Sequence, residues 1–206
     1  MRKFALFISL FFTYLCFAES NAERPNLDDL EVRKKIIEQA VEFDSVKKAN
    51  GSRQFFKPLE LSPYRGGGWG ALYYSNRNIK VLYQLKDGKQ DGLTIGWYEN
   101  GQKKAEVNYK DGKQDGLTTI WYENGQKKAE GNYKDGKEDG LVTFWYENGQ
   151  KKDESNWRDG KVVNGKVWLP DGRICPISKI KDGSGVFVVY DNEGKEVSRK
   201  KFKDGF

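Results

Sequence analysis

The sequence contains no histidine, and this absence excludes several kinds of chemistry at once. There can be no histidine general acid or base, no Ser–His or Cys–His nucleophile, and no metal site with histidine ligands. Only two cysteines occur in the 206 residues, too few for a zinc site built from thiolates. We therefore expect no catalytic residue, no metal and no other cofactor, and we expect that the protein is not an enzyme.

Proline is also scarce, whereas glycine and aromatic residues are plentiful. Five prolines stand against 23 glycines, and the many glycines indicate tight turns. Apolar residues make up 37% of the chain and aromatic residues 14%, and the aromatic share is too high for a disordered tail. The net charge of +6 is spread over interspersed charges of both signs, so we expect no nucleic acid partner.

The one long apolar run lies at the N-terminus and is typical of a secretory signal peptide. Two cations precede the apolar residues 4–17, and small residues allow cleavage after Ala18 or after Ala22. The run is shorter than the ~20 residues that a transmembrane helix needs. We therefore expect residues 1–18 to be a signal peptide and the protein to be exported, as a periplasmic or secreted protein.

The two cysteines are expected to have different fates. Cys16 lies within the expected signal peptide, and Leu15 is bulky for a lipidation signal, so we do not expect a lipoprotein. Cys175 would then be the single thiol, either buried or paired with another chain. The apolar neighbours Ile174 and Ile177 favour burial.

Residues 19–64 form an N-terminal segment, and its first part is typical of one amphipathic helix. Asn26 is a candidate N-cap, acidic residues follow it, and the helical pattern runs to about Phe43. The expected apolar stripe consists of Leu30, Ile37, Ala40 and Val41. We expect this helix to pack on the first part of a β-sheet and to cover an edge of it, and the alternative is that it binds a partner protein.

Residues 65–206 consist of one unit repeated along the chain. Residues 97–116 and 121–140 are identical at 18 of 20 positions, at a spacing of 24 residues. A third copy opens at Trp145 and then diverges, and looser copies precede and follow these three. A period of this length indicates a stacked-repeat architecture, here of five to six repeats with degenerate ends.

Each unit carries an Asn-Gly pair and an Asp-Gly pair, as at Asn124-Gly125 and Asp135-Gly136. Both dipeptides supply the positive φ angles of two-residue hairpin turns. The residues between them, such as 127–133, alternate in polarity as a half-buried strand does. We therefore predict a mainly β fold, an elongated single-layer antiparallel meander of β-hairpins with one N-terminal amphipathic helix.

The unit W-Y-x-N-G followed by Y-K-D-G-K-x-D-G resembles the MORN repeat variant of the YwqK-family antitoxins, and the leader identifies the chain as similar to exported bacterial members. The resemblance covers residues 65–206. It implies a hairpin meander that serves binding or scaffolding, with no established catalytic residues. Arg77-Asn78 departs from the turn pattern in the first copy and Pro170-Asp171-Gly172 shortens a later one, so these end copies are expected to be caps.

Aromatic residues that recur in every unit are the candidate binding residues. We expect a tryptophan ladder on one face of the sheet and a tyrosine ladder on the other, one of them structural. The second would be an exposed platform for sugar rings or cationic groups. The candidates are Trp97, Trp121, Trp145, Tyr98, Tyr122 and Tyr146.

Recurring charged residues are expected to be structural. The acids around Asp87 and Asp91 fail the spacing of a calcium loop, and a glutamate copied into every unit does not mark one active site. The lysine pairs, such as Lys127-Lys128, alternate with glutamates and are expected to form a solvated face. The alternative for these lysines is binding to anionic lipid or polysaccharide.

Three functions fit these observations. The leading hypothesis is a non-enzymatic exported repeat protein that binds or scaffolds another protein in the cell envelope. One alternative is a carbohydrate- or cell-wall-binding module that uses the exposed aromatic ladder on an envelope polysaccharide. The other is an antitoxin-like neutralising protein, which export disfavours unless the toxin is exported too. Membrane contact, where it occurs, is expected to be peripheral.

Overall fold

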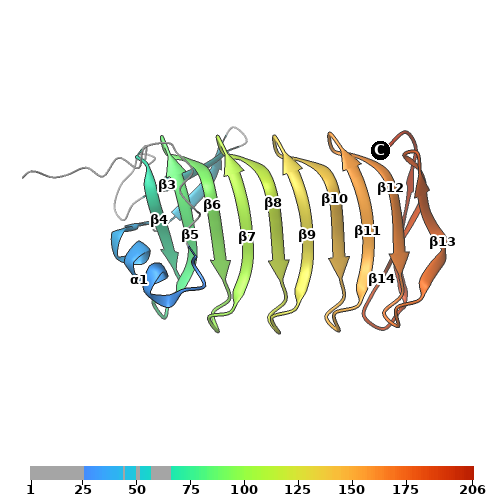
Figure 1. Cartoon of the computed structure of the whole chain (residues 1–206), viewed down its shortest axis with the longest axis horizontal. Coiled ribbons are helices and arrows are strands. Elements are labelled where there is room, and N and C mark those ends of the chain that lie inside the picture. The colour runs from blue at the N-terminus through green and yellow to red at the C-terminus, as the bar shows by residue number, and fades with distance from the viewer. Residues whose placement is uncertain (1–25, 44, 50–51, 57–65) are drawn as a thin grey trace, which may run out of the picture.

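The computed structural model describes residues 26–43, 45–49, 52–56 and 66–206 (Figure 1). The expected signal peptide and the expected boundary between residues 64 and 65 lie outside these ranges. The described chain is mainly β, with one helix and one open sheet of 13 strands, and this confirms the predicted fold class. Within the described ranges, no helix has the length and apolar character needed to cross a membrane.

The large sheet follows the order β1-β4-β5-β6-β7-β8-β9-β10-β11-β12-β13-β14-β15, so successive strands from β4 onward are neighbours. Its strands are β1 (Val41–Glu42), β4 (Gly68–Tyr73), β5 (Ile79–Lys86), β6 (Lys89–Trp97), β7 (Lys103–Lys110), β8 (Lys113–Trp121), β9 (Lys127–Lys134), β10 (Lys137–Trp145), β11 (Lys151–Arg158), β12 (Lys161–Trp168), β13 (Ile174–Lys181), β14 (Ser184–Tyr190) and β15 (Glu196–Phe202). A separate hairpin pairs β2 (Ser45–Ala49) with β3 (Ser52–Phe56).

Two kinds of turn connect these strands. Asp135 and Gly136 both have positive φ, 49° and 83°, so the Asp-Gly turns are the predicted two-residue turns. The same prediction was wrong for the Asn-Gly turns. Gly125 N donates to Tyr122 O (3.0 Å) and Tyr122 N donates to Gln126 O (2.8 Å), which closes a three-residue loop over residues 123–125. Asn-Gly suits both loop lengths, and the dipeptide alone does not distinguish them.

Cross-strand pairing divides the sheet into two faces, because directly paired residues point to the same side. We name the side on which the helix packs the helix face and the other side the reverse face. The helix face contains a continuous row of paired residues: Leu82, Ile95, Glu106, Thr119, Glu130, Thr143, Glu154 and Lys166. The reverse face contains the next row: Gly96, Ala105, Ile120, Ala129, Phe144, Asp153 and Val167.

The helix α1 (Leu30–Gln39) begins later and ends earlier than predicted. Its N-cap is Asp29, whose side chain accepts hydrogen bonds from the backbone N–H groups of Glu31 (2.9 Å) and Val32 (3.2 Å). The predicted cap, Asn26, instead accepts from Asp28 N (3.1 Å) in the preceding turn. The helix stops before Phe43 because the chain turns at residue 40 into strand β1.

Helix α1 lies on the helix face at the N-terminal end of the sheet (Figure 1). Leu27 and Ile36 pack there against a buried cluster that includes Ile95 and Trp97. Leu30, expected in the buried stripe, is 66% exposed. The sheet edge is covered by β1, which pairs in parallel with β4, and not by the helix as predicted.

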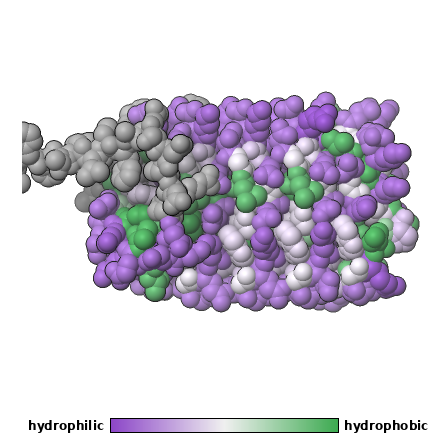
Figure 2. Space-filling model, viewed as in Figure 1, coloured by the Kyte–Doolittle hydropathy of each residue, from purple (hydrophilic) through white to green (hydrophobic). Residues whose placement is uncertain are grey.

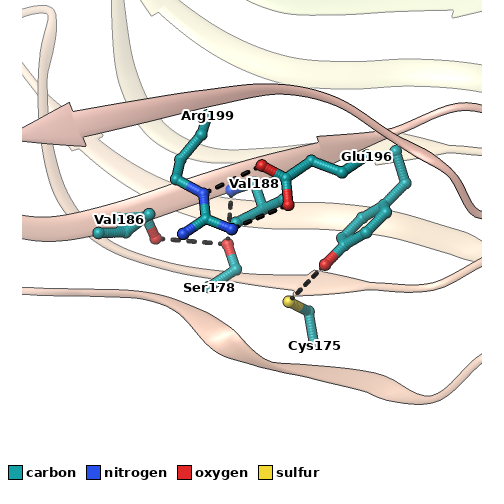
Figure 3. Close-up of polar contacts among 7 residues, drawn as sticks. Cys175, Ser178, Val186, Val188, Glu196 and Arg199 are labelled. Atoms are coloured by element: carbon teal, nitrogen blue, oxygen red, sulfur yellow. Dashed lines mark hydrogen bonds and ion pairs between the residues drawn. The ribbon is translucent and has the colours of Figure 1, made fainter.

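The C-terminal strands roll back over the reverse face (Figure 1). Strands β13 and β14 pair over only three residue pairs, and the Ser178 hydroxyl then bridges them by donating to Val186 O (3.3 Å) and accepting from Val188 N (3.0 Å) (Figure 3). The Phe187 ring reaches β12 at Gly165, where a Cβ would lie 2.9 Å from the ring. A glycine at this point therefore allows the close approach.

Cys175 is buried, as predicted, but not for the predicted reason. Its side chain is 2% exposed, and its Sγ lies 3.2 Å from the Tyr190 hydroxyl (Figure 3). The flanking Ile174 and Ile177 are 57% and 53% exposed, so these apolar neighbours are not part of the environment that buries the thiol. The thiol is buried instead by Val167 of β12 and by residues of the rolled strand β14, among them Val188 and Tyr190.

We expect Gly125→Ala to lower the free energy of unfolding by about 1–2 kcal/mol, the cost of a left-handed L-residue. Gly125 has φ +82° and no atom within 4 Å of its added Cβ, so the effect isolates backbone strain. Gly96→Ala is the matched control, because its Cβ meets only ordinary contacts at 3.7 Å or more. Denaturant unfolding of both variants tests this, and equal losses would show that the Asn-Gly loops lack the described geometry.

Candidate functional site

The tyrosine ladder ties each repeat to the next. The hydroxyl of Tyr98 donates to the backbone oxygen of Trp121, and that of Tyr122 donates to the backbone oxygen of Trp145, both at 2.8 Å. Tyr74 and Tyr146 make the equivalent bonds in the flanking copies. Burial raises the pKa of each of these four hydroxyls. The tyrosines are therefore the structural ladder.

The tryptophan ladder lies on the helix face, and its environment changes along the array. Trp97 is 2% exposed beneath α1, with the Arg33 guanidinium 5.7 Å from its ring centroid. Trp121 and Trp145 lie beyond the helix and are half-buried. Lysine ammonium groups, from Lys103 and Lys127, lie 5.4 Å and 5.7 Å from their ring centroids. These rings are covered by cations and are not bare platforms.

Each lysine pair serves both faces of the sheet. Lys127, the first of its pair, forms an ion pair with Glu130 (2.6 Å) on the helix face. Lys128, the second, places its ammonium 5.2 Å from the ring centroid of Tyr122. In the next repeat, Lys151 forms the ion pair with Glu154, and the ammonium of Lys152 lies over the ring of Tyr146. The pairs are therefore built into the repeat in addition to being solvated.

Beyond α1, the helix face carries an open apolar stripe. Leu93 is buried in the cluster beneath the helix, whereas its counterparts Leu117 and Leu141 are 45% and 44% exposed. Figure 2 shows this face as a mainly hydrophilic surface with small separate apolar patches. We name Leu117, Trp121, Leu141 and Trp145 the open stripe.

The reverse face carries a pocket between the centre of the sheet and the rolled C-terminal strands. The cavity has a volume of about 370 Å³ and is lined mainly by apolar side chains, among them Phe144, Trp157 and Phe187. Tyr122 and Trp145, two of the predicted candidates, also line it. We name this cavity the reverse-face pocket.

Asp153 lines the reverse-face pocket and departs from the repeat. The preceding copies have alanine at this position, Ala105 and Ala129, and the row of paired residues runs through all three. Burial raises the pKa of the Asp153 carboxyl to about 7, and the nearby Lys152 charge opposes this only in part. Asp153 was not among the predicted site residues, although its replacement of a repeated alanine was the signal in the sequence.

The recurring aspartates beside the Asp-Gly turns hold neighbouring turns together. Asp91 accepts a hydrogen bond from the backbone N–H of Asp111 (3.1 Å), and Asp115 accepts one from Asp135 (3.4 Å). Across the described ranges, no cluster of His, Cys, Asp or Glu has the composition of a metal site. The acids of these turns therefore serve the stacking of repeats.

Three consecutive stretches of the chain match the family model described as MORN repeat variant, at residues 90–111, 114–135 and 138–159. Each stretch spans one hairpin, from the beginning of an even-numbered strand to the following Asp-Gly turn. A search of curated proteins found no match. This part of the chain is thus similar to MORN repeat variants, which often take part in binding proteins or membranes.

The structure separates the six candidate residues into different environments. Tyr98, Tyr122 and Tyr146 make structural hydrogen bonds, and Trp97 is covered by α1. Trp121 and Trp145 belong to the open stripe. Sequence reasoning missed Leu117 and Leu141, because a leucine within a strand is typical of a core residue. It also missed the pocket residues, because they come from strands that are far apart in the sequence.

We expect Tyr122→Phe to lower the free energy of unfolding by about 1 kcal/mol, because it removes the hydrogen bond to Trp145 O. Tyr133→Phe is the matched control, because the Tyr133 hydroxyl makes no hydrogen bond to a described residue. Thermal or denaturant unfolding compares the two. A loss of the same size in both variants would contradict a structural role for the tyrosine ladder.

We expect the stability of the parent protein to fall as the pH rises from about 4 to about 7, because the native state holds a proton on Asp153 that the unfolded chain has released. Asp153→Ala should remove this slope and give a protein more stable than the parent above pH 7. Melting temperatures across this range measure both effects. Asp139→Ala, near the beginning of β10 and with Asp153 intact, should keep the parental slope. A slope unchanged in Asp153→Ala would contradict the assignment.

Proposed function

We propose that this chain is a non-enzymatic, exported repeat module whose helix face binds an amphipathic helical segment of another protein in the cell envelope. The observation that carries the proposal is the packing of the chain's own helix α1 on the first repeat. The same kind of surface is open on the next two repeats. The array can therefore hold a second helix beside the first.

The contacts of α1 indicate which chemistry the open stripe recognises. Apolar side chains of the helical segment cover Leu93 and Trp97, and Lys103 binds the carboxylate of Asp28 (2.7 Å) while also pairing with Glu106 (3.2 Å). Lys127 and Lys151 occupy the same repeat position and pair with their own glutamates. A partner helix with an apolar stripe and acidic residues beside it would complement the stripe in the same way.

Export and the absence of catalysis rest on the sequence. Residues 1–18 have the pattern of a signal peptide, and the repeated charged residues serve the repeat and not one reaction centre. The resemblance to the YwqK-family antitoxins adds a narrower possibility, neutralisation of a toxin that is itself exported. The carbohydrate alternative loses support from the geometry, because lysine ammonium groups cover the faces of the ladder rings.

Photo-crosslinking in cells tests this proposal. We expect a photoreactive amino acid at Leu117 or Leu141 of the full-length protein to capture one protein partner through a helical segment, identified by mass spectrometry of the crosslinked peptide. Val197, 57% exposed on the terminal strand β15, is the matched control position and should not capture it. Leu117→Glu with Leu141→Glu should abolish co-purification of that partner while the melting temperature stays within a few degrees of the parent.

Equal capture from Val197, or co-purification unchanged in the double glutamate variant, would contradict docking on the open stripe. Recovery of envelope polysaccharide without any protein would favour the carbohydrate-binding alternative. An exported toxin as the captured partner would support the antitoxin-like role.

A further inference from the structure

We propose that the reverse-face pocket binds a small amphiphilic carboxylate, a molecule with an apolar alkyl or aryl body and one anionic end. Apart from Trp145, which contributes atoms to both, the pocket lining and the open stripe lie on opposite sides of the sheet. The pocket therefore does not depend on the protein-binding function proposed above.

The pocket has the size and lining of a small-molecule site. Its volume of about 370 Å³ falls within the range of roughly 300–1,000 Å³ that is usual for such sites. Phe144 and Trp157 belong to the centre of the sheet, whereas Phe187 and Phe202 come from the rolled strands and pack edge-to-face at 6.4 Å. Phe144 is still 40% exposed, so an apolar body can reach it and bury more of its surface.

The pocket is formed by positions that differ from the inner repeats. Phe144 occupies the place of Gly96 and Ile120, and Asp153 occupies the place of Ala105 and Ala129. The rolled strands reach the sheet because Gly165 leaves space for the Phe187 ring. The site therefore occurs once in the described part of the array, as a specific ligand site requires. The ladders, in contrast, are repeated in unit after unit.

The charges around the pocket favour an anion. Lys128, Lys152 and Lys200 line it from three different strands, against the single acid Asp153. None of these three lysines forms an ion pair with a described residue, whereas the helix-face lysines Lys127 and Lys151 both do. An anionic group at the rim can therefore pair with lysines that are not already held in an ion pair within the described chain.

Asp153 gives the site a proton-dependent affinity. Within the described chain it makes no hydrogen bond or ion pair, and burial raises the pKa of its carboxyl to about 7. In its protonated form it can donate a hydrogen bond to the bound carboxylate, and in its ionised form it repels one. The other titratable groups in this region are Lys128, Lys152, Lys200, Tyr122, Tyr146, Tyr190, Asp191 and Cys175.

Calorimetric titration of the full-length protein with decanoate, below its micelle concentration, tests the proposal. We expect one decanoate per chain and an affinity that falls about tenfold from pH 6 to pH 8, because the protonated fraction of a group with a pKa of about 7 falls by that factor. Decyltrimethylammonium has the same tail with the opposite charge and should bind more weakly at both pH values. Repeating the titration in buffers of different ionisation enthalpy should show proton uptake on binding.

Two substitutions assign the binding to this pocket. Asp153→Ala restores the residue of the inner repeats and removes both the hydrogen bond of the protonated carboxyl and the repulsion of the ionised one. Its affinity for decanoate should therefore lie between the parental values at pH 6 and pH 8, without pH dependence. Lys128→Met combined with Lys200→Met should weaken decanoate binding and leave the binding of decanol unchanged. Circular dichroism and melting temperature check that each variant is folded.

Three results would overturn the proposal. The first is no decanoate binding to the folded parent at either pH. The second is tighter binding of decyltrimethylammonium that Asp153→Ala abolishes, which would make Asp153 the counter-ion of a cationic ligand. The third is decanoate binding that neither Asp153→Ala nor the double methionine variant changes, which would place the ligand elsewhere on the protein.

Discussion

The structure depends on hydrogen bonds that fasten each hairpin to the next at both ends of the strands. At one end, each loop tyrosine donates to the tryptophan carbonyl of the following repeat, as Tyr122 does to Trp145 at 2.8 Å. At the other end, the turn glycine Gly136 donates its N–H to Gln114 of the preceding unit at 2.8 Å. A single hairpin cannot supply these partners, so the array is stable only when repeats stack.

This regular stacking leaves two faces with different properties. Lysines of each pair reach opposite sides, where Lys127 pairs with Glu130 and Lys128 lies over Tyr122. On the helix face, lysine and glutamate side chains consequently neutralise each other, and leucine and tryptophan side chains lie between these pairs. The reverse face keeps its lysines without ion pairs among the described residues. The first face is the one proposed to bind an amphipathic partner, and the second is the one proposed to bind a small anion.

Departures from the repeat mark the places where the molecule acquires distinct sites. Helix α1 converts one stretch of the helix face into a buried core, which indicates what the neighbouring open stripe can bind. Asp153 and Phe144 replace small or aliphatic residues at the other end, where the rolled strands close the pocket. The identical inner repeats serve mainly as the frame that separates these two regions.

The sequence by itself determined the architecture, because a repeated period with alternating polarity and Asp-Gly turns permits few folds other than a hairpin meander. It also indicated the helix, whose cap was placed wrongly because Asn26 and Asp29 are both good caps. Only the tertiary structure decided that the tyrosines are structural, that Leu117 and Leu141 are exposed, and that Asp153 lies in a pocket. The role of the tyrosines depends on the stacking of neighbouring repeats. The exposure of the leucines depends on how far α1 extends over the sheet, and the pocket depends on the rolling of β14 at Gly165, which are contacts between residues far apart in the chain.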